Sequence, residues 1–273
     1  MDGLLSWYDR AARDLPWRRP GVSPWAVLVS EVMLQQTPVV RVLPAYQDWM
    51  VRWPTPAALA SDSPGEAVRA WGKLGYPRRA LRLHSCAVVL VSRFGGEVPA
   101  DVESLLCLPG VGSYTARAVA AFAFGQRQPV VDTNVRRVVA RAFTGQGEAG
   151  PPSTARDLAA VEALLPSAPA VAARASVALM ELGALVCTAR TPRCDECPLR
   201  GSCAWRLAGS PPYRGPTVRP QRFAGTDRQV RGLLLDVLRA SPAPVEARAL
   251  DALIVDGLID PLPDGRYALP GAS

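Results

Sequence analysis

The sequence predicts an all-α protein with a small C-terminal appendage. Hydrophobic residues make up 49% of the 273 residues and charged residues 20%, so the chain can bury a substantial core. Apolar residues recur at helical spacing, and no segment shows the sustained alternation with turn signals that is typical of strands. A Pro- and Gly-rich stretch at 209–226 reads as a linker that sets the last segment apart.

The first half of the chain divides into short helices. Ser23 followed by Pro24 is a typical helix start, because serine caps the first turn and proline suits its first position. Further prolines punctuate short segments, and a Gly-Tyr-Pro turn separates two later helices. The helices expected here are 25–36, 67–74 and 79–94, followed by the two helices of a hairpin over 101–120.

The second half adds two helices within 153–186, then a cysteine-rich loop and the linker. Two more helices, 228–240 and 246–258, and a Pro-Asp-Gly turn before Arg266 make up the appendage, which suggests a winged-helix-like unit. The expected domains are a six-helix domain with the hairpin over 24–140, an iron–sulfur cluster domain over 1–23 and 141–208, the linker 209–226 and the appendage 227–273.

The charge balance points to an acidic partner. A formal charge of +7 makes nucleic acid the first candidate. No apolar run approaches the roughly 18 residues of a membrane span, and no signal peptide opens the chain. We therefore expect a cytoplasmic monomer without membrane contact. Lys73 is the only lysine and His84 the only histidine, so a lysine nucleophile has one candidate and a histidine-based triad or metal site is disfavoured.

Four cysteines, Cys187, Cys194, Cys197 and Cys203, lie within 17 residues. In a cytosolic protein such a group is typical of metal binding rather than disulfides. Zinc sites usually have two close pairs of ligands, whereas only one pair is close here. Uneven spacing suits a [4Fe–4S] cluster, with zinc and disulfides or free thiols as alternatives. Cys86 and Cys107, which stand alone in apolar helical contexts, are expected in the core.

The hairpin between the two helices of 101–120 is a candidate DNA-binding element. Asp101 can cap the first helix and Ser113 the second. Two glycines allow a tight turn whose N–H groups lie beside a helix N-terminus, where a DNA phosphate can bind without sequence readout. The alternative is an ordinary helix–helix turn. The turn residues are Pro109, Gly110, Val111 and Gly112.

Two carboxylates stand in apolar surroundings. Glu31 lies in a mainly apolar helix, and Asp132 follows Pro-Val-Val directly after the hairpin. A buried acid is costly unless it has a partner or a chemical task. Two such acids can divide the work of breaking a glycosidic bond, one as proton donor and one as stabiliser of an oxocarbenium ion. The alternative for each is a helix cap or an ion pair.

Residues 5–205 resemble the iron–sulfur DNA glycosylases of the helix-hairpin-helix superfamily, and among them the adenine glycosylases of the MutY type. The resemblance implies a fold of two helical lobes with a cluster loop. It rests on ordered motifs: Leu15-Pro16-Trp17-Arg18, Ser30-Glu31-Val32-Met33-Leu34-Gln35-Gln36-Thr37, Gly72-Lys73-Leu74-Gly75-Tyr76, Leu108-Pro109-Gly110-Val111-Gly112, Val131-Asp132-Thr133-Asn134-Val135-Arg136-Arg137, Met180-Glu181-Leu182-Gly183-Ala184 and the four clustered cysteines.

The resemblance also implies an activity, the excision of adenine mispaired with 8-oxoguanine or guanine in double-stranded DNA. Glu31 would protonate N7 of a flipped adenine, and Asp132 would stabilise the sugar cation, either as a nearby charge or by a transient covalent bond. Tyr114 and Asn134 would position these groups and water. Arg13, Trp17, Leu34 and Glu181 match residues that line the adenine pocket, and Gln36 and Tyr76 match residues that fill the opened base stack.

Three positions distinguish branches of the superfamily. The endonuclease III branch, which also cuts the strand, has a lysine where Tyr114 stands, so a Schiff-base lyase is not expected. The thymine-mismatch branch lacks an acid at the position of Glu31. Because Glu31, Tyr114 and Asp132 are all present, the adenine branch fits best. The alternatives are a glycosylase for another base and a non-catalytic cluster-containing DNA-binding module.

The sequence also departs from the family. Only 47 residues follow the linker, and no histidine lies beyond His84, so we expect the usual C-terminal reader of 8-oxoguanine to be absent. The opposite-base preference therefore stays open. Pro77 stands where the family often has a second tyrosine.

Overall fold

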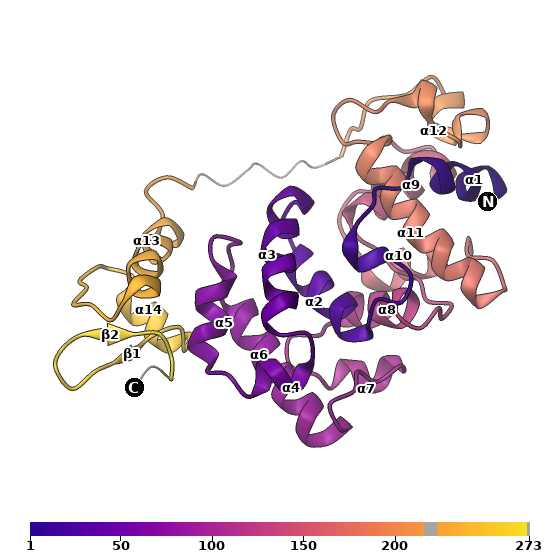
Figure 1. Cartoon of the computed structure of the whole chain (residues 1–273). Helices are drawn as coiled ribbons and strands as arrows, with labels where there is room; N and C mark the ends of the chain where they lie inside the picture. Colours follow the sequence, from indigo (N-terminus) through magenta and orange to yellow (C-terminus); the bar gives the residue numbers. More distant parts are fainter. Residues whose placement is uncertain (216–222, 272–273) are drawn as a thin grey trace. The chain divides into compact units, whose positions relative to one another are not determined.

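A computed structural model of the chain describes residues 1–215 and 223–271. Helices dominate, and the only strands among the described residues are two of two residues each. The described residues group into two compact units (Figure 1). Unit 1 contains 1–22 and 113–215, and unit 2 contains 23–112 and 223–271. The sequence predicted that residues 113–140 belong to the six-helix domain. In the structure they belong to the same unit as the cluster loop.

The helices of unit 2 begin where the sequence supplies caps. Ser23, Thr55, Ser63 and Asp101 each accept a hydrogen bond from a backbone N–H of the first turn, and three of them are followed by proline. The prolines that punctuate the sequence are therefore mostly helix starts. The helices are α2 (Pro24–Leu34), α3 (Val39–Arg52), α4 (Pro56–Ala60), α5 (Pro64–Trp71), α6 (Arg78–Phe94) and α7 (Val102–Leu106).

Tryptophans form the core of unit 2. The Trp49 ring meets Trp53 and Trp71 edge to face, with centroids 4.5 and 5.6 Å away. Trp25 of α2 donates to the Trp53 carbonyl at 3.0 Å, which ties α2 to the end of α3. This core anchors the helix that carries Glu31.

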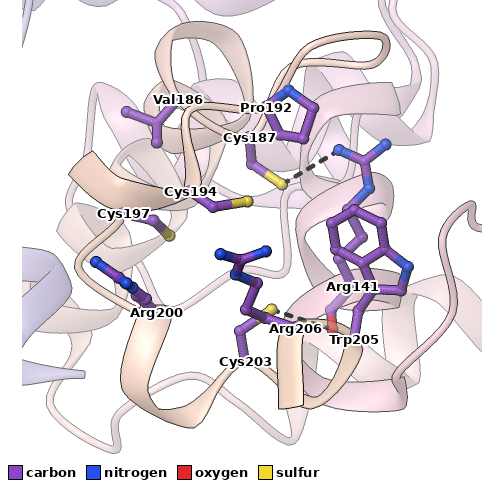
Figure 2. Close-up of a pocket in the computed structure, with 10 residues that line it drawn as sticks. All are labelled: Arg141, Val186, Cys187, Pro192, Cys194, Cys197, Arg200, Cys203, Trp205 and Arg206. Atoms are coloured by element: carbon purple, nitrogen blue, oxygen red, sulfur yellow. Dashed lines mark hydrogen bonds between the residues drawn. The ribbon is translucent and has the colours of Figure 1, made fainter. Parts of the chain in front are cut away.

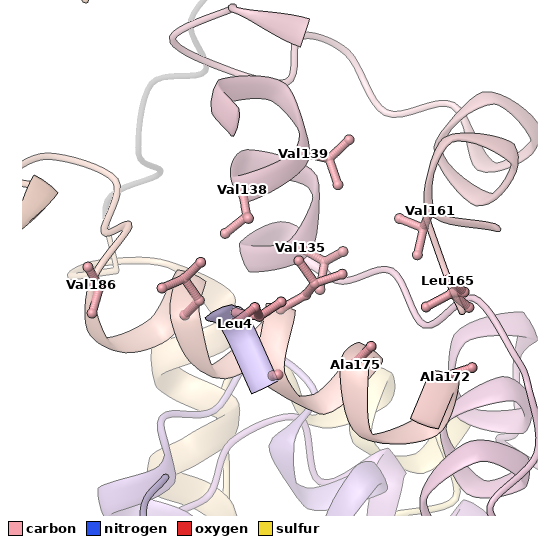
Figure 3. Packing of buried hydrophobic residues seen from close by; sticks show 12 residues of the cluster. Leu4, Val135, Val138, Val139, Val161, Leu165, Ala172, Ala175 and Val186 are labelled. Carbon is pink, nitrogen blue, oxygen red and sulfur yellow. The ribbon is translucent and has the colours of Figure 1, made fainter. Parts of the chain in front are cut away.

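Unit 1 packs around two helices that bury aliphatic side chains. Leu4 of the N-terminal helix lies against valines of α9 and leucines of α11, as Figure 3 shows in part. The chain thus returns its first residues to a core that is otherwise built after residue 130. The elements are α1 (Asp2–Ala11), η1 (Pro16–Arg18), α8 (Ser113–Phe122), α9 (Thr133–Thr144), α10 (Thr154–Glu162), α11 (Pro169–Leu185), η2 (Cys194–Glu196), η3 (Arg200–Ser202) and α12 (Ala204–Leu207).

The appendage consists of α13 (Asp227–Ala240), α14 (Leu250–Val255) and the antiparallel strands β1 (Asp260–Pro261) and β2 (Tyr267–Ala268). Two helices followed by a small β-hairpin is the order expected for a winged-helix-like unit. The appendage contacts α5 of unit 2: the Gly65 N–H donates to the Pro270 carbonyl at 2.8 Å, and Arg239 donates to the Val68 carbonyl at 3.2 Å.

Several boundaries differ from expectation. The helix expected at 67–74 is α5, which starts earlier at the Ser63 cap and ends at Trp71 because Gly72 has a φ of +52°. The appendage helix expected at 246–258 shortens to α14, which ends before Gly257 with its φ of +66°. Residues 216–222 of the expected linker lie outside the described residues.

Cys86 is buried as expected, but the prediction for Cys107 was wrong. Cys107 is the exposed C-cap residue of α7, a helix of which only Leu105 is buried. Within the described residues, no helix is long and apolar enough to cross a membrane. The monomeric state and the cytoplasmic location stay predictions.

Candidate active site and cluster loop

Glu31 lies on α2 in a fully buried and mainly apolar stretch of unit 2. Every residue from Trp25 to Met33 is buried, and Glu31 itself is 5% exposed. A helix that is apolar on nearly all sides is stable when it is buried on all sides. A polar side chain in such a helix is costly to bury unless it has a partner or a chemical task. Leu34, the last residue of α2, is half-buried and lies one turn beyond Glu31.

Asp132 of unit 1 is the N-cap of α9. Its Oδ1 accepts from the Val135 N–H at 2.7 Å, and its Oδ2 accepts from the Asn134 side-chain amide at 2.8 Å. Burial nevertheless raises the pKa of this carboxyl above its ordinary value, against the opposing effect of these hydrogen bonds. The helix-cap alternative is therefore true of Asp132, and the capping bonds also fix the direction of its carboxylate.

Asn134 is held by backbone that approaches it closely. A Cβ on Gly183 of α11 would lie 2.7 Å from the Asn134 Cβ, so only glycine fits there. Tyr114, on the first turn of α8, is partly buried beside Met180 against an alanine-rich cluster. α8, α9 and α11 thus bring Tyr114, Asp132 and Asn134 into the same unit.

Glu181 of α11 is the most enclosed carboxylate of unit 1. Arg13 donates to the Glu181 carboxylate from Nε and Nη2, both at 2.7 Å, and Arg18 donates to it from Nη1 at 2.9 Å. Burial alone would raise its pKa, but the two guanidiniums outweigh burial and lower the pKa to about 2. Trp17, which precedes Arg18 on η1, is 5% exposed. Arg13, Arg18 and Glu181 therefore form one ion-paired cluster next to the buried Trp17 in sequence.

The hairpin turn lies at the end of unit 2. Gly110 has a φ of +79°, and a Cβ on it would lie 2.8 Å from the Cβ of Arg82 on α6. Val111 is buried, whereas Gly110 and Gly112 are exposed. The turn is thus anchored by valine and presents glycine backbone to solvent, as an anion-binding turn requires.

Gln36 and Tyr76 share an unusual backbone state. Their φ angles are +54° and +50°, and among the described residues Ser210 is the only other non-glycine with positive φ. Both side chains are exposed, Tyr76 by 45%. Strained, exposed and bulky residues are typical of functional sites.

The four clustered cysteines face one common space (Figure 2). Arg141 adds positive charge: its Nη1 lies 3.7 Å from the Cys187 sulfur, and its carbonyl accepts from the Cys203 thiol at 3.5 Å. Four thiols and nearby cations suit an anionic iron–sulfur cluster. The space is lined by Arg141, Val186, Cys187, Pro192, Cys194, Cys197, Arg200, Cys203, Trp205 and Arg206.

The thiols fit a cluster better than a single ion. Within the part of the chain that the structure describes, no three His, Cys, Asp or Glu side chains converge tightly enough to hold one metal ion. Zinc needs its ligands around one point, whereas a cubane cluster binds each thiolate through a separate iron, so its ligands stand farther apart.

Arg137 of α9 connects the cluster loop to the Asp132 pair. Its guanidinium donates to the Cys187 carbonyl at 2.7 Å, to the Gly183 carbonyl at 2.7 Å and to Asn134 Oδ1 at 2.8 Å. Asn134 in turn donates to Asp132. A continuous hydrogen-bonded chain therefore runs from a cluster ligand to the candidate catalytic carboxylate.

Each predicted site residue can now be placed. Unit 1 brings together the Asp132–Asn134 pair, the Glu181 cluster and the four cysteines. Unit 2 holds Glu31, Leu34, Gln36, Tyr76 and the hairpin turn. Sequence reasoning assigned no role to Arg18, Arg79, Arg137 or Arg141. Arg18 and Arg137 stood within matching motifs, but nothing local marks an arginine whose partners lie far along the chain.

Comparison with known proteins places these features in a family context. Residues 29–162 match the model of the HhH-GPD superfamily base excision DNA repair proteins, and residues 187–203 match the iron-sulfur binding domain of endonuclease III. The second match assigns an iron–sulfur cluster, [4Fe–4S], to the four-cysteine loop.

Similar chains extend over almost the whole length. An adenine DNA glycosylase of Mycobacterium tuberculosis is 60% identical over 98% of this chain and 92% of its own length, and one of Mycolicibacterium smegmatis is 59% identical over 98% and 95%. The structure of a thermostable thymine-DNA glycosylase matches with a TM-score of 0.67 at 28% identity, over 76% of this chain and 94% of that one.

Proposed function

Because this chain belongs to the helix-hairpin-helix superfamily of base excision DNA repair proteins, and within it to the adenine DNA glycosylase family, we propose that it hydrolyses the N-glycosidic bond of adenine mispaired in duplex DNA. The observation that carries the proposal is the pair of carboxylates in different settings. Glu31 is buried on α2, 5% exposed, and Asp132 is an N-cap oriented by two hydrogen bonds. This division suits one proton donor and one anionic stabiliser.

Glu31 acts as the general acid. Its carboxyl group, which is buried on α2, donates a proton to N7 of adenine. The protonated base then leaves with the electron pair of the C1′–N9 bond as a neutral molecule. The sugar is left as an oxocarbenium ion, to which water adds a hydroxyl group while its proton passes to a carboxylate.

Asp132 stabilises that cation in its ionised form. Its raised pKa makes it a stronger partner for positive charge, and the Val135 and Asn134 bonds prevent it from rotating away. Asn134 is thus a positioning residue as well as a candidate for holding water. Tyr114, on the neighbouring helix α8, completes this side of the site.

The remaining residues recognise the base and the DNA. Glu181 is ionised and forms ion pairs with Arg13 and Arg18. It therefore stabilises the wall of the adenine pocket and does not transfer protons. Trp17 and Leu34 supply apolar surface for a flipped base, and Gln36 and Tyr76 fill the space that the base leaves. The hairpin turn 109–112 binds a backbone phosphate.

We further propose that the reaction stops at base removal. A lyase step needs an amine to form a Schiff base, and the only lysine, Lys73, lies in the loop after α5 and is ion-paired with Asp236 at 3.7 Å. The abasic product would need alkali or another enzyme for strand cleavage.

The iron–sulfur cluster would be held by Cys187, Cys194, Cys197 and Cys203. It would supply a rigid cross-link of the loop 187–203 and a redox-active centre, and base removal by Glu31 and Asp132 does not pass through it. Arg141 and Arg200 at the same space would balance its negative charge.

A panel of substrates tests the activity. The purified protein is incubated with duplexes that contain A opposite 8-oxoguanine, A opposite G, T opposite G and U opposite G, and each product is treated with alkali. We expect strand breaks at adenine only after alkali. Cleavage of the T:G or U:G duplex alone would assign the protein to the thymine-type activity that its structural similarity also permits.

The same panel addresses the opposite base. The appendage carries seven carboxylates and five arginines, a net charge of −2 that does not favour DNA contact. We therefore propose that residues outside the appendage discriminate 8-oxoguanine from guanine. An Asp132→Asn variant that keeps DNA affinity but releases no base excludes a purely DNA-binding role.

A further inference from the structure

The guanidinium of Arg79 is buried without a carboxylate partner. Arg79 is the second residue of α6 and is 7% exposed. It forms no ion pair within the described residues. Burial lowers its pKa to about 10, which shows how much the site disfavours the charge. A buried cation is retained only where its hydrogen bonds serve a purpose.

Those hydrogen bonds run to the end of α2 and to the loop before α6. Nη1 donates to the carbonyls of Val32, Met33 and Gln35, at 2.9, 3.1 and 2.6 Å. Nη2 donates to the Gly75 carbonyl and to Thr37 Oγ1, both at 3.0 Å. The free carbonyls at a helix C-terminus thus take the place of a carboxylate.

Two of these carbonyls directly precede the strained residues. The Gln35 carbonyl belongs to the peptide before Gln36, and the Gly75 carbonyl to the peptide before Tyr76. The orientation of the preceding peptide determines φ, so one guanidinium holds both residues at positive φ. Its charge also lies over the Tyr76 ring, 5.4 Å from the centroid.

Other contacts complete the junction. Thr37 Oγ1 lies 3.3 Å from the carbonyl oxygens of Gln35 and Leu74, one on each segment. Trp71 donates to the Gly75 carbonyl at 2.9 Å. The segments around Gln36 and Tyr76 are therefore hydrogen-bonded to each other as well as to Arg79.

We propose that Arg79 is a positioning residue that makes Gln36 and Tyr76 a single rigid wedge for opening stacked base pairs of duplex DNA. This inference rests on the proposed glycosylase function. The strain at both residues is held before DNA arrives, so little ordering is needed when the side chains enter the stack. Glu31 lies on α2, which ends at Leu34, two residues before Gln36.

Two variants of α6 test the role of the guanidinium. Arg79→Lys keeps the charge and loses the planar fork, because an ammonium cannot reach both carbonyls in one plane. Arg93→Lys is the matched control, since Arg93 is exposed near the other end of α6 and contacts neither segment. Melting temperatures identify any general loss of fold.

The decisive measurement compares a paired substrate with one that is already open. On a fully stacked A:8-oxoguanine duplex, we expect Arg79→Lys to lower the single-turnover rate by about tenfold or more. On adenine in an unpaired bubble the loss is expected to be under about threefold, and Arg93→Lys to match the wild type on both. Equal losses on both substrates would overturn the proposal.

A double-mutant cycle tests the wedge without any change at Arg79. If Gln36 and Tyr76 act as one body, Gln36→Ala and Tyr76→Ala will be strongly non-additive on the stacked duplex, because removing either one disables the pair. Additive losses would contradict a single wedge.

Fluorescence separates this inference from the proposed function. 2-Aminopurine placed beside the mismatch brightens when the stack opens, whether or not a base is cut. A wild-type protein that brightens the probe without excising adenine would refute the glycosylase activity and keep the wedge. Identical brightening by Arg79→Lys would refute the wedge.

Discussion

Arg137 donates a 2.7 Å hydrogen bond to the backbone carbonyl of Cys187, the first ligand of the iron–sulfur loop. The same guanidinium also donates to Asn134, which donates to Asp132, so one cation connects the cluster loop to the Asp132–Asn134 pair. We expect Arg137→Lys to lower the iron content and the excision rate together, because a lysine cannot satisfy all three acceptors. Arg136→Lys, whose side chain pairs with Asp157 at 2.7 Å instead, should change neither. An Arg137→Lys protein with full iron content and the wild-type excision rate would show that the hydrogen bonds of Arg137 affect neither cluster binding nor catalysis.

Asp132→Asn separates chemistry from folding. Asparagine caps helices as well as aspartate does, so the free energy of unfolding should change by no more than about 1 kcal/mol. Because the folded-state pKa of Asp132 is raised, ionisation at neutral pH disfavours folding, and removal of the charge offsets part of the lost bond to Asn134. Excision should fall by about a thousandfold or more, since no anion faces the sugar cation.

The wild-type pH profile follows from the same residue. In the proposed mechanism Asp132 acts as an anion, so the excision rate should fall on the acid side as pH drops through its raised pKa. Single-turnover rates between pH 4 and 8 check this. A flat acid limb would argue against Asp132 as the anionic group.

Glu181 should make stability depend on pH. Its folded-state pKa of about 2 lies below the ordinary value of 4.5, so its contribution is fully present above 4.5 and is lost as pH falls towards 2. Glu181→Gln is expected to cost about 2–3 kcal/mol at neutral pH, because Arg13 and Arg18 lose their counter-charge. In urea titrations the gap between variant and wild type should narrow at pH 3. A gap that stays constant would show that charge is not the cause.

The cluster can be tested through its ligands. Cys194→Ala removes one of the four thiolates, so the purified protein should lose most of its brown colour and iron. Cys107→Ala, at the exposed C-cap of α7, should keep both. One zinc in colourless wild-type protein would contradict the [4Fe–4S] assignment.

Gly65 controls the contact between the appendage and α5. A Cβ there would lie 2.5 Å from the Pro270 carbonyl oxygen, so Gly65→Ala should loosen the appendage. Hydrogen exchange would then rise in α13 and α14 and stay unchanged in α3. Gly232→Ala, which meets nothing within 4 Å, should leave exchange unchanged or slower. Equal exchange in both variants would show that this contact does not hold the appendage.

Local signals in the sequence predicted much of this architecture. Ser23 and Asp101 cap their helices as expected, and the spacing of the four cysteines predicted the cluster that the family comparison assigns. The helix caps and the cluster loop each depend on residues that lie close together in the chain. The spacing of such residues therefore predicts the local structure directly. The exposed Cys107 shows the limit, since an apolar neighbourhood in sequence does not say which face of a short helix is covered.

The sequence by itself thus determined the helical class and the cluster loop, and it predicted the DNA-binding turn and the two catalytic acids. Only the tertiary structure decided which arginines serve them. Arg13 meets Glu181 across 168 positions, and Arg79 meets Gln35 across 44. A guanidinium carries no local sign of its partner, because its hydrogen bonds are satisfied by whichever carbonyls or carboxylates the packing of distant helices brings within reach.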